Sequence, residues 1–294
     1  MPQQEHETKA TKTPSRDRWD RCVELLVLDL TKPITREKYE EVSCDIFDVS
    51  NKWFDRVLAL YNEPHRAYHN WTHVDDVLAS LDFLLEGKQQ QADEVKCDVI
   101  IATFSAFFHD VIYNPKSSTN EKDSADLFVE FLTELSGVLS KHGCGVKNSQ
   151  MKHGVVECII ATASHISSAM KANQSGNEIV SIFLDADISI LGKCADDYNK
   201  YAVSIRKEYS FVERDVYCEK RAEILQSFLP VDAEDTPKTG VKEDERSAML
   251  TVERRHNYIF ATERGRLRWE ENARQNLKRE IEMLQQGTIP SESI

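Results

Sequence analysis

The stretch at residues 104–125, FSAFFHDVIYNPKSSTNEKDSA, decides which fold the sequence predicts. Phe104, Phe107 and Phe108 are spaced as on one face of a helix, and the adjacent pair His109-Asp110 follows directly. A short polar loop then leads into an acidic segment. An imidazole beside a carboxylate at the end of an apolar helix is either a helix terminus that reaches water or part of a metal site.

Helical spacing of apolar residues recurs along the chain, and the alternation typical of strands is absent. The predicted helical segments are residues 46–61, 97–111, 155–163, 198–209, 222–229 and about 267–286, the last ending before Gly287. The sequence therefore predicts an all-α fold with one domain at residues 17–294, after a disordered tail at residues 1–16. Residues 230–249, which are rich in Asp, Glu, Lys, Pro and Thr, are expected to form an exposed, mobile acidic loop.

The composition excludes several classes of protein. A chain of 294 residues with 40% hydrophobic and 30% charged residues is typical of a soluble globular protein. The net charge of −13 argues against a nucleic-acid surface. The longest apolar run is about half of the roughly 20 residues that a membrane span needs, and the polar N-terminus does not resemble a secretory signal. Seven scattered cysteines without a C-x-x-C pair predict free thiols and a cytoplasmic location.

Residues that can bind a metal occur at four separate places that we expect to be helical. They are His69 and His73, whose i, i+4 spacing would place them on one face of a helix, the pair His109-Asp110, His165, and the acids Asp185 and Asp187 in the apolar segment SIFLDADISILG. Any one of them alone is usually an ordinary surface or core residue, and Asp185 is equally well explained as a helix cap. A carboxylate in an apolar segment nevertheless costs several kcal/mol unless it is paired or bound to a metal. The combination is therefore much harder to explain by chance than any single member.

The order of these residues, H…HD…D, resembles that of the HD superfamily of metal-dependent phosphohydrolases. The closest similarity is to a subgroup with a Y-H-N-x-x-H motif and covers roughly residues 20–290. It is carried by the words YHNWTHVDDVL, FFHDVIYNPKSSTNEKDSA, FLDADISILG, YAVSIRKEY, KRAEILQSFL and NYIFATE…ENARQNLKREIEML. The resemblance implies a helical bundle of the HD type, a divalent metal, and hydrolysis of a phosphate ester or anhydride.

The resemblance also implies roles for individual residues. Its metal ligands fall on His73, His109, Asp110 and Asp187. His69 is then expected to be a substrate-facing neighbour of the ligands, with direct binding of the metal as the alternative. For His165 three roles stay open, namely catalysis with a second metal, a phosphate contact, and a structural role.

The chemistry of the ligands narrows the choice of metal. Imidazole and carboxylate together suit Mn, Fe, Co, Ni or Zn, whereas Mg binds imidazole less readily. Besides binding the metal, Asp110 is expected either to bridge to a second ion or to orient the attacking water. Glu121 has two interpretations: it is a catalytic acid that protonates the leaving oxygen, or it belongs to a capping box that starts at Ser118.

An anionic substrate needs positive charge in an acidic protein. The candidate substrate-binding cations are Arg66, Arg206 and Arg221, because arginine binds phosphate with two parallel hydrogen bonds. The alternative for the last two is a salt bridge to Glu208 or Glu223 on a solvated helix.

Taken together, the sequence predicts a metal-dependent phosphohydrolase whose substrate is a small phosphorylated metabolite, with nucleotides among the candidates. One alternative is a non-catalytic HD module that senses a nucleotide. Another is a helical interaction protein whose histidines belong to the core. The sequence does not specify the substrate or the oligomeric state.

Overall fold

The computed structural model describes residues 13–31, 34–86, 92–146, 150–230 and 257–290, and all the regular elements within these ranges are helical. This confirms the predicted all-α class. The α-helices are α1 (Pro14–Leu30), α2 (Arg36–Tyr61), α3 (Trp71–Leu85), α4 (Ala92–Phe108), α5 (Asn120–Lys141), α6 (Gln150–Ala161), α7 (His165–Ser175), α8 (Glu178–Asp187), α9 (Ala195–Glu208), α10 (Arg214–Phe228) and α12 (Glu263–Gln285). Two 3₁₀ segments, η2 (Thr162–Ser164) and η3 (Ile188–Gly192), follow α6 and α8.

Several helices begin where the sequence supplies a capping residue. The hydroxyl of Thr13 accepts a hydrogen bond from the Arg16 amide, and Pro14 occupies the first turn of α1. The first helix therefore begins before residue 17, where the domain was predicted to start. The rest of the predicted tail, residues 1–12, and residues 231–249 of the predicted acidic loop lie outside the described residues.

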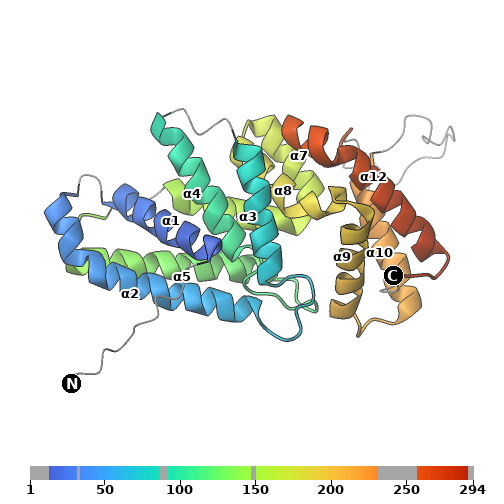
Figure 1. Cartoon of the computed structure of the whole chain (residues 1–294), viewed down its shortest axis with the longest axis horizontal. Coiled ribbons are helices and arrows are strands. Elements are labelled where there is room, and N and C mark those ends of the chain that lie inside the picture. The colour runs from blue at the N-terminus through green and yellow to red at the C-terminus, as the bar shows by residue number, and fades with distance from the viewer. Residues whose placement is uncertain (1–12, 32–33, 87–91, 147–149, 231–256, 291–294) are drawn as a thin grey trace, which may run out of the picture.

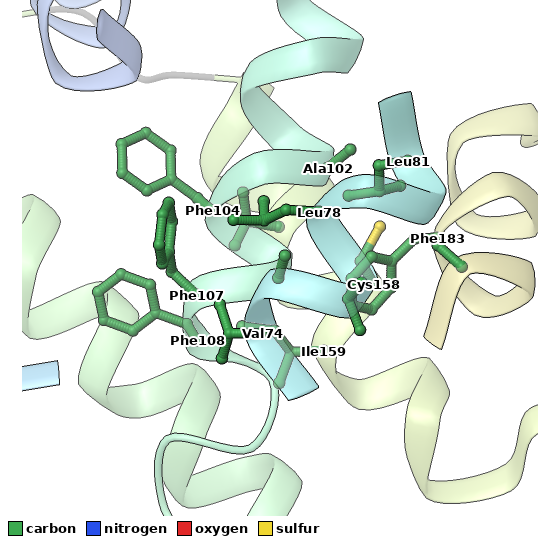
Figure 2. Packing of buried hydrophobic residues seen from close by; sticks show 14 of the residues in the cluster. Val74, Leu78, Leu81, Ala102, Phe104, Phe107, Phe108, Cys158, Ile159 and Phe183 are labelled. Carbon is green, nitrogen blue, oxygen red and sulfur yellow. The ribbon is translucent and has the colours of Figure 1, made fainter. Parts of the chain in front are cut away.

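The apolar face of α4 is buried as predicted. Phe104, Phe107 and Phe108 are inaccessible to solvent, and all three rings contact the indole of Trp19 from α1. Figure 2 shows these side chains beside Val74 and Leu78 of α3, with Phe183 of α8 on the other side of those two residues in this view. Packing on this scale holds the end of α4, and the residues that follow it, in a fixed position.

The helices form an elongated bundle. Figure 1 shows α1, α2 and α5 at one end, α9, α10 and α12 at the other, and α3, α4 and α8 between them. Contacts of α3 and α4 with α8, and of α12 with η3 and α10, connect the two ends. None of the described helices is long and apolar enough to cross a membrane.

Asp185 and two glycines tie α12 to α8. The buried Asp185 carboxylate accepts hydrogen bonds from the Ala261 and Thr262 amides and from the Thr262 hydroxyl, just before α12 begins. Asp185 is therefore a tertiary cap for another helix and not a surface residue. A Cβ at Gly265 would lie 2.4 Å from this carboxylate, and one at Gly192 would lie 2.6 Å from the Trp269 carbonyl oxygen. Only glycine allows these close approaches.

Candidate metal centre

The centre of the candidate site is a group of three side chains, His73, His109 and Asp187, which can together hold a metal ion. These three residues are called the metal-binding group below. The two Nε2 atoms lie 3.0 Å apart, and they are 3.2 and 3.4 Å from Oδ1 of Asp187. An ion with ligand bonds of about 2.1 Å would separate neighbouring ligand atoms by about 3.0 Å in octahedral and about 3.4 Å in tetrahedral geometry. The observed separations fall in this range. The three side chains are 3%, 1% and 10% exposed, so little water reaches them.

Each of the three residues lies where a helix begins or ends. His73 is in the first turn of α3, and Asp187 is the last residue of α8. The α4 helix ends at Phe108, earlier than the predicted end at residue 111, so His109 and Asp110 lie in the turn that follows it. The amide of His109 still donates to the Ser105 carbonyl, which keeps this turn in line with the helix.

The hydrogen bonds of His109 show that its free nitrogen is suited to a cation. Its Nδ1–H donates to the Ala106 carbonyl at 3.0 Å, so in the neutral ring the lone pair is on Nε2 and points at His73 and Asp187. Burial by itself would raise the pKa of Asp187, but the neighbouring His109 lowers this pKa well below its ordinary value. Burial would lower the pKa of His109, but the neighbouring Asp110 raises it well above its ordinary value. These side chains therefore favour a positive charge among them, which a proton on His109 supplies in the free protein and a bound metal ion would supply in its place.

Asp110 approaches the same pair of histidines from another direction. Its Oδ2 lies 3.2 Å from Nε2 of His109 and 3.7 Å from Nε2 of His73. Burial would raise the pKa of this carboxyl, but His109 and His69 lower it below the ordinary range. Asp110 is therefore an ionised carboxylate within reach of an ion held by the three central residues.

His165 contacts the metal-binding group through Asp187. It begins α7 after the 3₁₀ segment η2, and its Nε2 lies 2.7 Å from Oδ2 of Asp187. Asp187 thus presents one oxygen to His73 and His109 and the other to His165. This places His165 as a hydrogen-bonding partner that orients the Asp187 carboxylate.

His69 lies in the loop before α3 and not, as expected, on a helix face shared with His73. Its Nδ1–H donates to the carboxylate of Glu208 at 2.7 Å, and its Nε2 is 3.9 Å from Oδ2 of Asp110. Burial would lower the pKa of His69, but the carboxylates of Asp110 and Glu208 raise it. The ring is therefore held with its second nitrogen towards the metal-binding group.

Glu208 is the most important site residue that the sequence did not reveal. Its buried carboxylate accepts the backbone amides of Ala67, Tyr68 and His69 at 2.8, 2.7 and 3.0 Å, besides the His69 ring. The hydroxyl of Tyr113 donates to it as well, at 2.8 Å. Burial would raise the pKa of Glu208, but the bond to His69 lowers it to about 2.

A cavity of about 540 Å³ opens beside the metal-binding group. His69, His73, Asp110, His165 and Asp187 line one part of it. Its other walls are mainly aromatic and aliphatic, formed by Tyr68, Tyr113, Ile188, Ile190, Leu191, Tyr201, Ile205, Tyr209, Val212, Tyr217, Ile224, Leu225 and Phe228. The cavity therefore joins an end suited to a metal and an anion to a chamber that is mainly apolar and fits a small organic group. Lys220 and Arg221 also line the cavity.

Glu121 lines this cavity, and the predicted capping box is wrong. Helix α5 begins at Asn120 with Thr119 as its N-cap, so Ser118 does not cap it and Glu121 is the second helical residue. The Asn120 side chain binds both the amide and the carbonyl of Asn114, which fixes the loop after His109-Asp110. Glu121 thus reaches the cavity from the first turn of α5, next to Asn120, which holds the preceding loop in place.

Two of the three predicted substrate-binding arginines lie elsewhere. The Arg66 side chain is fully buried, and its guanidinium donates to the carbonyls of His69, Asp110 and Val111. Arg206 donates to the carbonyls of Tyr209 and Val212 beyond the end of α9. These guanidinium groups stabilise the backbone around the site and are not on the cavity wall. Only Arg221 of the three lines the cavity.

Comparisons with known proteins add no assignment: no family model matches the chain, and neither does any curated protein.

Proposed function

We propose that the protein is a metal-dependent phosphohydrolase of the HD type that acts on a small phosphorylated metabolite, with nucleotides among the candidate substrates. The observation that carries the proposal is the buried group of His73, His109 and Asp187 at the end of a cavity large enough for such a metabolite. Asp110 serves as the fourth ligand. Imidazole-rich ligands favour Mn, Fe, Co, Ni or Zn over Mg.

The side chains around the group have separate tasks in this proposal. A bound divalent ion would supply electrophilic activation of the phosphoryl group and a water of lowered pKa. Asp110, ionised and 18% exposed, accepts a hydrogen bond from the attacking water. His69 keeps its Nδ1 proton on Glu208, so its Nε2 takes or gives the proton in the cavity. His165 fixes the Asp187 carboxylate, and Glu121 is the candidate proton donor to the leaving oxygen.

The unpaired cysteines and the apolar cavity walls agree with this proposal. All seven cysteines are unpaired, which suits a reducing compartment, and we propose the cytoplasm as the location. The tyrosines and aliphatic residues of the cavity would contact the organic part of the substrate.

Metal analysis combined with a hydrolysis screen tests the proposal. The purified protein, Asp110→Ala and the matched exposed-acid control Asp126→Asn are assayed against phosphorylated metabolites with Mn²⁺, Fe²⁺ and Co²⁺ supplied separately. We expect bound metal and hydrolysis in the wild type and in the control, and a loss of about 100-fold or more in Asp110→Ala. Absence of bound divalent metal, or an Asp110→Ala variant as active as wild type, would refute the proposal. Metal binding without turnover of any compound would instead support the nucleotide-sensing alternative.

A further inference from the structure

Two buried polar atoms on one wall of the cavity have no hydrogen-bond partner. They are the hydroxyl of Tyr217 and Nη2 of Arg221, which lie one turn apart on α10. The two residues are only 5% and 8% exposed, and both line the cavity. In the part of the chain that the structure describes, the third such atom is Nε of Arg264, which is not on this wall. Burying a donor without a partner is costly, and native proteins rarely do so.

The Arg221 guanidinium is held in place on its Nε side, away from the unpartnered Nη2 atom. Its Nε–H donates to Oε1 of the buried Glu280 at 3.0 Å, and its guanidinium lies 5.2 Å from the centre of the Tyr201 ring. The second oxygen of Glu280 accepts the hydroxyl of Tyr198. Glu280 thus orients the guanidinium without using Nη2. A fixed arginine with an unused edge is a geometry suited to an oxyanion.

Arg221 does not pair with the acids of the metal-binding group. Its described ion pair is with Glu280, and neither Asp110 nor Asp187 forms one with it. Ring contacts connect the two places, since the Tyr68 ring lies 4.7 Å from the His73 ring and 4.7 Å from the Tyr201 ring, measured between centroids, and the Arg221 guanidinium lies over Tyr201. A ligand in the cavity can therefore place one acceptor at the metal-binding group and a second at Arg221.

We propose that Arg221 and Tyr217 form a second oxyanion site, and that the substrate carries two anionic groups. One is the phosphoryl group at the metal, and the other is a carboxylate or a second phosphoryl group at Arg221. Both donor atoms are closed to solvent in the free protein, so a neighbouring side chain shifts when the oxyanion binds. The oxyanion then accepts hydrogen bonds from Nη2 of Arg221 and from the Tyr217 hydroxyl, which supplies the partners that both atoms lack. The inference rests on the proposed function, since it assigns the metal end of the cavity to a phosphoryl group.

Non-hydrolysable phosphonates test the inference without depending on activity. Binding of alkylphosphonates to the Mn²⁺-loaded protein is measured by calorimetry, over a series of increasing chain length. Each compound is compared with its analogue carrying a terminal carboxylate and with its analogue carrying a terminal second phosphonate. We expect the second anionic group to tighten binding about tenfold or more at the chain length that spans the cavity. The analogue that binds more tightly shows whether the second anionic group is a carboxylate or a phosphoryl group.

Two variants separate the proposed site from a structural role. Tyr217→Phe removes a hydroxyl that has no partner in the free protein, so the fold is retained and the melting temperature is unchanged or higher. Arg221→Lys keeps the charge next to Glu280 but removes the planar edge. We expect both variants to reduce the gain in affinity that the second anionic group provides. The Kd of the plain phosphonate should stay within about twofold of the wild-type value. Tyr39→Phe, outside the cavity, is the matched control.

The outcomes distinguish this inference from the proposed function. Metal-dependent binding of plain phosphonates with no gain from a second anionic group would overturn the inference alone. A gain that persists in both Tyr217→Phe and Arg221→Lys would also overturn it. If no phosphonate binds in the presence of Mn²⁺, the proposed function and the inference both fail.

Discussion

Replacement of Glu208 by glutamine tests whether this carboxylate holds the His69 loop through its charge. In the folded protein it accepts three backbone amides, the His69 ring and the Tyr113 hydroxyl. Its pKa is lowered from 4.5 to about 2, and the side chain is fully buried. A difference of about 2.5 pKa units corresponds to roughly 3 kcal/mol of stability. Glutamine keeps the size of the side chain but loses this contribution.

The direction of the pH dependence follows from the sign of the shift. Because the folded pKa lies below the unfolded value, the stabilisation is fully present above about pH 4.5 and is lost as the pH falls through 2. The free energy of unfolding should therefore differ between wild type and Glu208→Gln by roughly 3 kcal/mol at about pH 6. At about pH 3.5 the difference should be roughly 2 kcal/mol.

Urea denaturation followed by circular dichroism, with chelator present, measures both differences. The control is Glu223→Gln, which removes an exposed acid paired with Lys220 and should change stability by less than about 0.5 kcal/mol. A Glu208→Gln variant as stable as this control at pH 6 would refute the argument. So would a difference from wild type that grows as the pH is lowered.

Three further predictions concern the metal and the backbone around it. Chelation should lower the melting temperature of wild type but not of His109→Ala, because a metal at 100 times its Kd stabilises the fold by about 2.7 kcal/mol. An equal drop in melting temperature in both proteins would place the ion elsewhere. Gly192→Ala should lower the free energy of unfolding by more than about 2 kcal/mol in urea titrations, since its Cβ would clash with the Trp269 backbone. Gly137→Ala, in open space on α5, should instead be neutral or stabilising by up to about 1 kcal/mol. Arg66→Lys should cost about 2–3 kcal/mol by the same assay, because three carbonyls lose their guanidinium donor, and an unchanged midpoint would contradict this role.

The helices could be predicted from the sequence because their signals are local. Apolar spacing placed the buried face of Phe104, Phe107 and Phe108, and Gly287 marked the end of α12. The helix ends were less certain, since α4 ends at Phe108 although the apolar pattern continues to Val111. The hydrogen bonds that end a helix depend on what packs beyond it, which spacing alone does not specify.

The residue types of the metal centre were also visible in the sequence, but their roles were not. The resemblance to the HD superfamily assigned the ligands to His73, His109, Asp110 and Asp187, and the structure brings His73, His109 and Asp187 together. An arginine that binds substrate and one that binds backbone carbonyls look alike in a sequence. Arg66 proved to be of the second kind.

The tertiary structure alone decided what surrounds the metal-binding group. Glu208 lies three residues after Ile205 and so continues the apolar face of α9. An acid on an apolar helix face was the one signal in the sequence that pointed to this residue. Its partners in the loop before α3, however, lie about 140 residues earlier in the chain, and Tyr113 lies 95 residues earlier. The unpartnered donors of Tyr217 and Arg221 are likewise defined by what α10 packs against. The sequence by itself determined the helices and the types of ligand, because these depend on neighbours within a few residues. The fold decided which groups share a cavity, because burial and hydrogen-bond partners depend on residues that are distant along the chain.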